Sequence, residues 1–447
     1  MTSSRQDIAS WGLALMALAG LQDVEAAESI PVVPGLEYAR HEEEGLISHV
    51  VKMDLKAKGL RIRSVKAKGK ETIRELVQRM DEPDSPVLAG INGDFFRQSS
   101  SAGLPYGIQV ADGRLIFAPM KRSMIGFGPK NEPYIGIVSL SAKFTFARKE
   151  DRKQAKWALI DDINVVEGES DRKSGIYLYT PAFLGLDLTR PSGLVAVVEA
   201  IEPALQVGDI CEGKVSQVVT SGKAVSVPET GCLLYFFGDA GRAVGSALKP
   251  GQPLALKIEL PPIVGGVAQA LGGGPRLVRD GKVGVELNRE VFDPVHAMEI
   301  SKRHPRSAIG YDRNRQFLFL VMVEGRHEGS RGMTFGELGE FMAKLGCHQA
   351  MAFDGGGSAG MHVAGRGTVT LSMGGSNRPE ERQVANGLLI TASKAAPAEK
   401  VSSKTTPKEA RKEAGKPEAK GSPSTGTKVA PERRKPEDPY GETPLKE

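Results

Sequence analysis

An acidic residue followed by glycines ends an apolar run in the stretch AMAFDGGGSAGMHV, residues 350–363. A carboxylate at the end of a strand, such as Asp354, can act as a general base or acid, or can bind a cation or a sugar hydroxyl. Consecutive glycines expose backbone N–H groups to an approaching anion, and three follow here: Gly355, Gly356 and Gly357. The alternative is that Asp and Gly only form a turn. We interpret Ser358 as a hydroxyl donor to a ligand or to the loop.

The same stretch also contains the pattern G-x-S-x-G, which is typical of a serine nucleophile held between a strand and a helix. The residues after Ser358, AGMHVAGRGTV, are interrupted by glycines and do not predict a helix. The order of that catalytic triad also requires an acid and then a histidine downstream, whereas only His362 follows, with no acid between. The context therefore excludes a serine hydrolase of this kind.

Other polar residues with chemical potential follow short apolar runs. NGDFF, residues 92–96, comes directly after VLAGI. Arg306, in HPRSAIGYD, precedes an apolar strand and could grip a phosphate or carboxylate with two parallel hydrogen bonds, although a solvated arginine is the usual alternative. The loop EGRHEGSRGM contains Glu324 and His327, and either a functional or a solvent-exposed loop has this composition. A single loop histidine is more often incidental.

The elements that would position these residues form two similar units of strand, capped helix and strand. The first covers residues 49–55, 72–80 and 87–91, and the second covers 317–323, 334–346 and 350–354. Thr72 with Glu75 and Thr334 with Glu337 predict capping boxes, and Gly346 predicts a helix end. Such a unit normally places its two strands in parallel, with ligands bound beyond their carboxyl ends. We therefore expect Asn92 and Asp354 to lie together.

The segment between these units is predicted to be rich in strands. Between residues 134 and 262, runs such as GIYLYT and CLLYFFG alternate with Gly and Pro turns. Beyond it, Asp280 and Gly281 predict a hairpin turn, and residues 306–323 predict a second hairpin.

Composition limits the classes of function. The formal net charge is +5, and residues 394–447 carry 13 basic and 9 acidic residues, so 13 − 9 = +4 belongs to this last segment and the body is nearly neutral. No basic stripe predicts nucleic-acid binding. The last segment lacks large apolar residues and is predicted to be a disordered tail, which either only solvates the chain or makes loose contact with an anionic cell-wall polymer.

The first 26 residues resemble a secretory signal peptide. A single Arg5 precedes the apolar run WGLALMALAGL, and small residues follow it. The run is too short to span a bilayer, and a surface helix is the alternative. We therefore expect a secreted or periplasmic protein with no transmembrane span.

The three cysteines do not predict a metal centre. Cys211 and Cys232 could form a disulfide, or all three could be small buried apolar residues. No CxxC or HExxH pattern occurs, which argues against zinc.

Six motifs in one order resemble the phosphodiester glycosidase family, in which N-acetylglucosamine is removed from a phosphodiester. They are AGINGDFF, ALGGGPRLVRDGKV, HPRSAIGYD, VEGRHEGSRGMTFGELGEFMAKLGC, AMAFDGGGSAGMHV and RPEERQVANGLLI. The resemblance implies a β-rich mixed α/β domain, of a family with exported bacterial members linked to exopolysaccharide or the cell wall. It divides the chain into a signal peptide (1–26), two parts of one catalytic domain (27–133 and 263–393), a β-rich middle segment (134–262) and a tail (394–447).

The resemblance also implies the residues of the site. The predicted catalytic residues are Asp354 and Arg306, which the resemblance implies, and Asp94, which would add a carboxylate where the family frequently has glycine. The predicted substrate-binding residues are Asn92, Gly93, Gly273, Gly274, Arg326, Ser330, Gly355, Gly356, Gly357, Ser358 and Arg382. The chain departs from the family pattern at four positions: Asp94 replaces a frequent glycine, Ser307 a threonine, Glu324 an aspartate and Ala359 a serine.

We expect an exported enzyme that hydrolyses a sugar-1-phosphodiester and releases sugar and a phosphomonoester. Arg306 and loop amides would hold the phosphodiester, while Asp354 or Asp94 activates water, with Glu324 as a third carboxylate. No cofactor is required by this scheme, and a divalent cation such as Ca²⁺ on Asp side chains stays open, since DRNRQ at Asp312 is only a fragment of a calcium loop. The competing hypothesis is a non-catalytic protein that binds glycan or cell wall.

Overall fold

The structure is a computed structural model that describes residues 28–43, 45–98, 103–165, 172–181, 193–202, 205–220, 224–292, 301–369 and 381–393. The predicted signal peptide, 1–26, and the predicted tail, 394–447, lie outside these ranges. Within them, no helix is long and apolar enough to cross a membrane.

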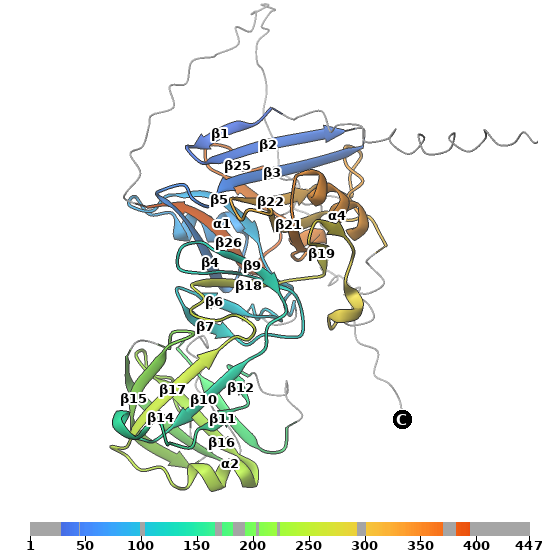
Figure 1. Ribbon diagram of the computed structural model, residues 1–447. Coiled ribbons are helices and arrows are strands. Elements are labelled where there is room, and N and C mark those ends of the chain that lie inside the picture. Colours follow the sequence, from blue (N-terminus) through green and yellow to red (C-terminus); the bar gives the residue numbers. More distant parts are fainter. Residues whose placement is uncertain are drawn as a thin grey trace, which may run out of the picture. The chain divides into compact units, whose positions relative to one another are not determined.

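An eight-stranded sheet, the first sheet, contains the second predicted unit (Figure 1). Its strands, in spatial order, are β1 (Ile30–Val33), β2 (Leu36–Glu43), β3 (Leu46–Asp54), β22 (Phe317–Val323), β21 (Arg306–Tyr311), β23 (Gln349–Ala352), β19 (Arg276–Arg279) and β20 (Lys282–Val283). Helix α4 (Phe335–Lys344) covers one face with Leu338 and Met342 against Val321 and Ala350. Its predicted capping box is present, and Gly346 follows its end with a φ of +93°.

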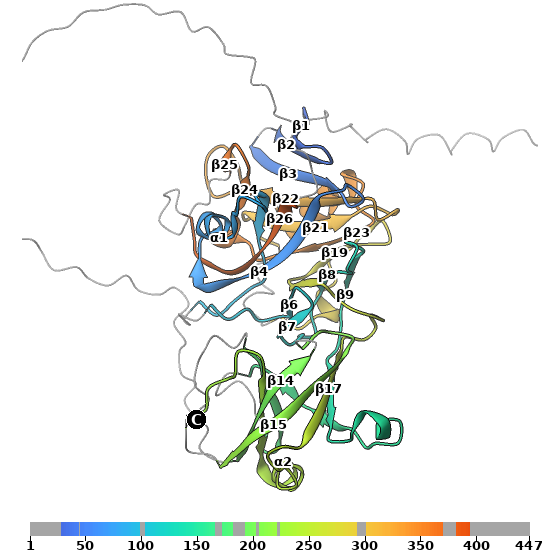
Figure 2. The ribbon, with the colours of Figure 1, turned by 90° about the vertical axis from the view of Figure 1, so that its left-hand side faces the viewer.

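A five-stranded sheet, the second sheet, contains the second strand of the first predicted unit, whereas the predicted first strand, residues 49–55, overlaps β3 in the first sheet. Its order is β25 (Gly367–Thr368), β24 (Met361–Val363), β5 (Val87–Asn92), β26 (Val384–Ala392) and β4 (Leu60–Glu71). Helix α1 (Ile73–Met80), opened by the predicted capping box at Thr72, packs Leu76 and Val77 on its outer face. The two sheets bury apolar residues such as Met322 and Leu388 against each other, so the core consists of helix, sheet, sheet and helix layers (Figure 2).

The structure corrects the pairing of neighbouring parallel strands expected from the sequence. In the first unit the strand before the helix is β4 rather than β3, and β26, distant in sequence, pairs antiparallel with both β4 and β5. In the second unit β21, the hairpin partner of β22, pairs antiparallel with both β22 and β23. An antiparallel strand therefore separates the two parallel strands that flank each helix.

The β-rich middle segment is confirmed and forms a sheet of its own. In spatial order this third sheet contains β11 (Ala158–Ile160), β10 (Ser141–Thr145), β17 (Pro253–Glu259), β15 (Ile210–Thr220), β14 (Leu194–Glu202), β16 (Cys232–Phe237), β13 (Gly175–Tyr179) and β12 (Asp162–Ile163). Helix α2 (Gly238–Gly245) follows β16 directly. Cys211 and Cys232 are free and buried in the core of this segment, so they are the small apolar residues of the second alternative.

A fourth, five-stranded sheet shares the core of the middle segment through residues such as Val110 and Ala270. Its order is β7 (Arg114–Phe117), β6 (Gln109–Ala111), β18 (Gln269–Gly272), β8 (Met124–Phe127) and β9 (Pro133–Gly136). Strand β18 ends just before the predicted site residues Gly273 and Gly274. Both predicted hairpins are present, because Asp280 and Gly281 join β19 to β20 with positive φ at both residues and β21 pairs with β22.

Candidate active site

The two polar turns predicted to meet are joined by hydrogen bonds. The Asn92 side chain is fully buried, and its Nδ2 donates to the backbone oxygen of Asp354 at 2.7 Å. The Asp354 amide donates to the oxygen of Gly93 at 3.0 Å, and the Ser307 hydroxyl donates to Asn92 Oδ1 at 2.6 Å. Asn92 and Gly93 therefore hold the ends of β5 and β23 together, and their role is to position the neighbouring residues.

Asp94, the next residue, is a buried carboxylate. Its Oδ1 accepts from the Phe95 amide at 2.8 Å and its Oδ2 accepts from the Gly107 amide at 2.5 Å. Burial raises the pKa of the Asp94 carboxyl to about 6, and the charge of Asp354 adds to this rise, while Arg122 and the two amides oppose it. A carboxyl group with this pKa changes its protonation state close to neutral pH, which suits proton transfer.

Asp354 is half-buried at the start of the glycine loop. Its Oδ1 accepts from the Gly355 amide at 2.9 Å, and a short 3-10 turn, η3 (Gly356–Ser358), follows. Gly356 has a φ of +59°, a conformation that favours glycine, and its amide is bonded to the Pro305 oxygen at 2.8 Å. After Ser358 the chain enters β24 rather than a helix, in agreement with the exclusion of a serine nucleophile.

Two predicted arginines lie against the glycine loop. A Cβ atom on Gly356 would be 3.1 Å from Arg326 Nη2, and a Cβ on Gly357 would be 2.7 Å from Arg382 Cζ. Arg326 Nη2 also lies 3.0 Å from His304 Nδ1. The absence of side chains at these two glycines thus leaves room for guanidinium groups beside the loop, an arrangement that attracts an anion.

Arg306 contacts the protein itself through its guanidinium. Its Nε donates to the Met333 oxygen at 2.9 Å, its Nη2 donates to the Lys302 oxygen at 2.8 Å, and it stacks on the Phe335 ring at 3.9 Å. The side chain lies close to the loop, since a Cβ on Gly355 would be 3.6 Å from Arg306 Cδ. These contacts hold Arg306 at the start of β21 through Nε and Nη2, and its binding of a phosphate stays a prediction.

Arg122 is a further arginine at the site that the sequence reasoning missed. It is 7% exposed, its Nη2 lies 3.9 Å from Asp94 Oδ1, and its guanidinium lies 4.4 Å from the rings of Phe95 and Phe292. An arginine just before the apolar run MIGF was the only available signal. The partner residues belong to segments distant in sequence, so the cluster could not be recognised before folding.

The predicted Gly273 and Gly274 form backbone contacts beneath the two carboxylates. Gly273 donates to the Ser123 oxygen at 3.1 Å, and Gly274 donates to the Ala352 oxygen at 2.8 Å. A Cβ on Gly273 would be 2.6 Å from the Ala352 oxygen. These glycines therefore allow the end of β18 to approach β23 and do not themselves present a chemical group.

The two predicted serines have different environments. Ser358 is buried, and its Oγ has no hydrogen-bond partner among the residues that the structure describes. Ser330 instead donates to the Glu324 oxygen at 2.7 Å and accepts from the Ile47 amide at 3.1 Å. Ser358 is therefore available to a ligand, whereas Ser330 stabilises the turn that carries Arg326.

Glu324, the third carboxylate considered, is satisfied by two histidines. Its Oε1 lies 2.6 Å from His49 Nε2, and its Oε2 lies 3.0 Å from His327 Nε2. Tyr38 Oη in turn lies 2.9 Å from His49 Nδ1. Burial alone would raise the pKa of Glu324, but the hydrogen bond and charge of His49, with His327, hold it below its ordinary value. This network joins β2 and β3 to the loop after β22.

No group of three or more metal-ligating side chains is found in the described ranges. The carboxylate of Asp312 accepts from the amides of Asn314, Gln316 and Phe317 and so closes a turn. A calcium site on Asp312 is therefore not supported, and any requirement for a cation stays a prediction.

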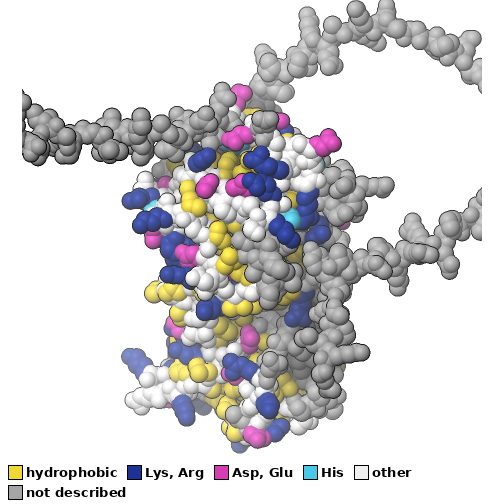
Figure 3. Space-filling model, turned by 90° about the vertical axis from the view of Figure 1, so that its right-hand side faces the viewer, with side chains coloured by type: hydrophobic (Ala, Val, Ile, Leu, Met, Phe, Trp, Pro, Cys, Tyr) yellow, Lys and Arg dark blue, Asp and Glu magenta, His cyan; other side chains and the backbone are white. Residues whose placement is uncertain are grey.

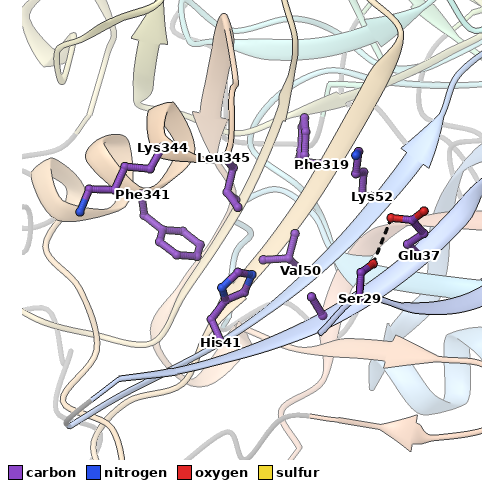
Figure 4. Close-up of a pocket in the computed structure, with 10 residues that line it drawn as sticks. Ser29, Glu37, His41, Val50, Lys52, Phe319, Phe341, Lys344 and Leu345 are labelled. Atoms are coloured by element: carbon purple, nitrogen blue, oxygen red, sulfur yellow. Dashed lines mark hydrogen bonds between the residues drawn. The ribbon is translucent and has the colours of Figure 1, made fainter. Parts of the chain in front are cut away.

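A separate hollow of about 310 Å³ lies on the side of the first sheet that carries α4 (Figure 4). Its floor is formed by Val50 and Phe319, and its edge by His41, Phe341 and Lys344. His41 packs edge-on against Phe341 with ring centroids 5.7 Å apart. None of the predicted site residues lines this hollow, so it is distinct from the candidate active site.

One face of the molecule carries charged side chains of both signs. On the face shown in Figure 3, Lys and Arg side chains are mixed with Asp and Glu over the described residues. The expected absence of a nucleic-acid partner stays a prediction.

Comparisons with known proteins bear on the family and the fold. Residues 207–391 match the model of the phosphodiester glycosidase family, a range that includes Asp354 but not Asp94 or Arg122. A search of curated protein sequences returns no match.

Among solved structures, a hypothetical protein from Synechocystis aligns with a TM-score of 0.63 and 20% identity. The alignment covers 83% of this chain and 64% of the Synechocystis chain. A protein from Burkholderia pseudomallei aligns with a TM-score of 0.56 and 22% identity, over 77% of this chain and 74% of that one. At these identities the alignments show a shared fold. The family model agrees with the resemblance predicted from the sequence motifs: residues 207–391 match a phosphodiester glycosidase domain.

Proposed function

We propose that the protein is an exported glycosidase that hydrolyses a sugar-1-phosphodiester, releasing the sugar and a phosphomonoester. The observation that carries this proposal is the meeting of Asp94 and Asp354 at hydrogen-bonded strand ends, with Arg122 beside Asp94 and two further arginines beside the glycine loop after Asp354. Glycosidases generally use two carboxyl groups, and an anionic substrate requires cationic partners.

In the proposed reaction Asp354 acts as the general base. It takes a proton from water as the water oxygen bonds to the anomeric carbon of the sugar. The bond from that carbon to the phosphate oxygen breaks, and its electron pair stays on the phosphate, which leaves as the phosphomonoester. Because a phosphate is already a good leaving group, stabilising its charge contributes more than strong protonation would.

The different environments of the carboxylates support different roles. Asp354 is half-buried and can reach water, whereas Asp94 is shielded and has a pKa of about 6. A neutral Asp94 does not repel an incoming phosphate, and it can donate a hydrogen bond to it. The glycine loop and Ser358 then form the surface against which the substrate lies.

Export and the link to exopolysaccharide or the cell wall are part of the proposal and come from the sequence alone. The N-terminal segment that supports export and the basic C-terminal segment proposed to contact an anionic polymer lie outside the described residues. A carbohydrate phosphodiester of the cell envelope is the substrate class that fits this location.

A ³¹P NMR screen of sugar-1-phosphodiesters with the full-length protein tests the activity without a prior choice of sugar. We expect a new phosphomonoester signal with wild type, and a rate lower by about 10²–10⁴-fold with Asp354→Asn. Asp239→Asn, at a carboxylate whose side chain is 99% exposed, is the matched control and should retain full activity. If wild type binds glycan but produces no phosphomonoester from any substrate, the protein is a binding protein instead.

A further inference from the structure

Arg122 is held in a corner between two aromatic rings. The rings of Phe95 and Phe292 lie at 75° to each other with centroids 6.1 Å apart, and the guanidinium carbon of Arg122 lies 4.4 Å from each. The Val291 amide donates to the Lys121 oxygen at 2.9 Å, and the Ser123 hydroxyl donates to Glu290 at 2.7 Å. The segments that carry Arg122 and Phe292 are therefore fastened on both sides of the contact, which fixes the plane of the guanidinium.

One edge of this guanidinium has no hydrogen-bond partner. Nε and Nη2 are both buried, and neither is bonded to any of the described residues. Asp94 Oδ1, 3.9 Å from Nη2, attracts the charge but is too distant for a hydrogen bond. Nε and Nη2 point to the same side of the guanidinium, so their two N–H groups form the fork that matches two oxygens of a phosphate.

Leaving two charged donors buried and unpaired costs stability, and a folded chain normally avoids this. Another buried arginine shows the usual solution. Arg276 donates through Nη1 to the Ile135 oxygen at 2.7 Å, through Nε to the Val278 oxygen at 3.3 Å and through Nη2 to Gln349. The contrast indicates that the donors of Arg122 are reserved for a group that is not part of the chain.

We propose that Arg122 binds the phosphoryl group of the substrate, with two of its oxygens accepting from Nε and Nη2. This inference rests on the proposed function and identifies the leaving-group side of the site as the side of Asp94. Since both nitrogens are shielded from solvent, an incoming anion must push aside the ring of Phe95 or Phe292, which are only half-buried. Arg326 and Arg382 lie beside the glycine loop.

Sulfate binding, measured by isothermal titration calorimetry at low ionic strength, tests the anion site without turnover. We expect Arg122→Met to weaken sulfate binding by about 10- to 100-fold, and Arg122→Lys, which keeps the charge but loses the fork, to weaken it less. Arg276→Met is the matched control: it removes a buried arginine and lowers stability but should leave sulfate affinity unchanged. Asp94→Asn should tighten sulfate binding, because it removes the carboxylate that competes for Arg122.

Turnover of the sugar phosphodiester found in the NMR screen provides the second measurement. Arg122→Met should lower kcat/KM by about 100-fold. If wild type hydrolyses the substrate and both Arg122 variants bind sulfate and turn over as wild type does, the Arg122 site is wrong and the proposed function stands. If sulfate binding depends on Arg122 but no phosphodiester is hydrolysed, the anion site stands and the proposed glycosidase activity fails. Should Arg122→Met not fold, Arg122→Lys decides.

Discussion

Two buried carboxylates at the ends of strands, Asp94 and Glu324, have opposite surroundings. Glu324 has a histidine on each oxygen, and its pKa is lowered. Asp94 receives two amides, lies beside an arginine with unpaired donors and has a raised pKa. The Glu324 cluster uses its hydrogen-bonding capacity internally, whereas the Asp94 cluster leaves part of it unused. The difference separates a stabilising network from a site prepared for a ligand.

The largest effects are expected when each of the two carboxylates is replaced by its isosteric amide, and they test the comparison most directly. Asp94→Asn should lower turnover per folded molecule by about 10²–10⁴-fold because it removes the titrating carboxyl group. Glu324→Gln should leave turnover per folded molecule unchanged and lower the free energy of unfolding by about 1–3 kcal/mol, because one histidine loses a charged acceptor. Turnover per folded molecule and urea unfolding measure the two effects.

The comparison fails if Glu324→Gln, corrected for folded fraction, loses as much turnover as Asp94→Asn does. His327→Asn serves as the matched control on the Glu324 side. It removes the more exposed partner of Glu324 and should cost less stability than Glu324→Gln.

A second effect concerns pH and Asp94. Its pKa is about 6 in the folded protein and about 3.9 in an unfolded chain. The folded state therefore binds the proton more tightly, and this contribution to stability is fully present below about pH 4 and is lost as pH rises through 6. The charged groups acting on Asp94 are Arg122 and Asp354, which oppose each other.

We expect wild type to lose on the order of 3 kcal/mol more unfolding free energy than Asp94→Asn between pH 4 and pH 7. Urea unfolding of both proteins across this pH range measures the difference in unfolding free energy. The contributions of the other titrating groups are shared by the two proteins and cancel in this difference. Parallel stability curves for the two proteins would show that Asp94 titrates normally and would remove its distinction from Glu324.

The smallest effects are expected at two glycines of the site. Gly357 faces an arginine side chain and is assigned to the ligand side, whereas Gly273 faces a backbone oxygen and is assigned to the backbone side. Gly357→Ala places a Cβ against the end of the flexible Arg382 side chain, so it should displace the guanidinium and lower kcat/KM by about tenfold with little change in stability. Gly273→Ala places a Cβ against the backbone oxygen of Ala352 and should cost about 1–3 kcal/mol of stability. Equal loss of stability in both variants would contradict the assignment of Gly357 to the ligand side.

The sequence predicted the parts of the fold that depend on local patterns. The capping boxes at Thr72 and Thr334, the turn at Asp280 and the meeting of Asn92 with Asp354 were all predicted correctly. The caps and the turn follow from residue types within a few positions. The meeting of Asn92 with Asp354 was predicted for one sheet, whereas β5 and β23 belong to two different sheets. The insertion of β26 between β4 and β5, and the pairing of β21 with β23, could not be predicted, because pairing partners distant in sequence leave no local pattern.

The site was predicted less completely for the same reason. The motif identified Arg306, but only the structure shows that its Nε and Nη2 donate to the backbone oxygens of Met333 and Lys302. Arg122 lies outside the motifs, and its corner needs Phe95 and Phe292, which are 197 residues apart (292 − 95). The chemical capacity of an arginine depends on what its donors contact, and that is decided by tertiary packing.

The central place of β26 has a consequence for the order in which the site is completed. This strand lies between β4 and β5, and its Asn386 accepts from the Asp94 amide at 2.9 Å while the Gly93 amide donates to the Asn386 oxygen at 3.0 Å. Among the described strands, β26 is the last in chain order, so synthesis on the ribosome makes it after all the others. The turn that carries Asp94 therefore lacks these two hydrogen bonds until β26 is inserted between β4 and β5.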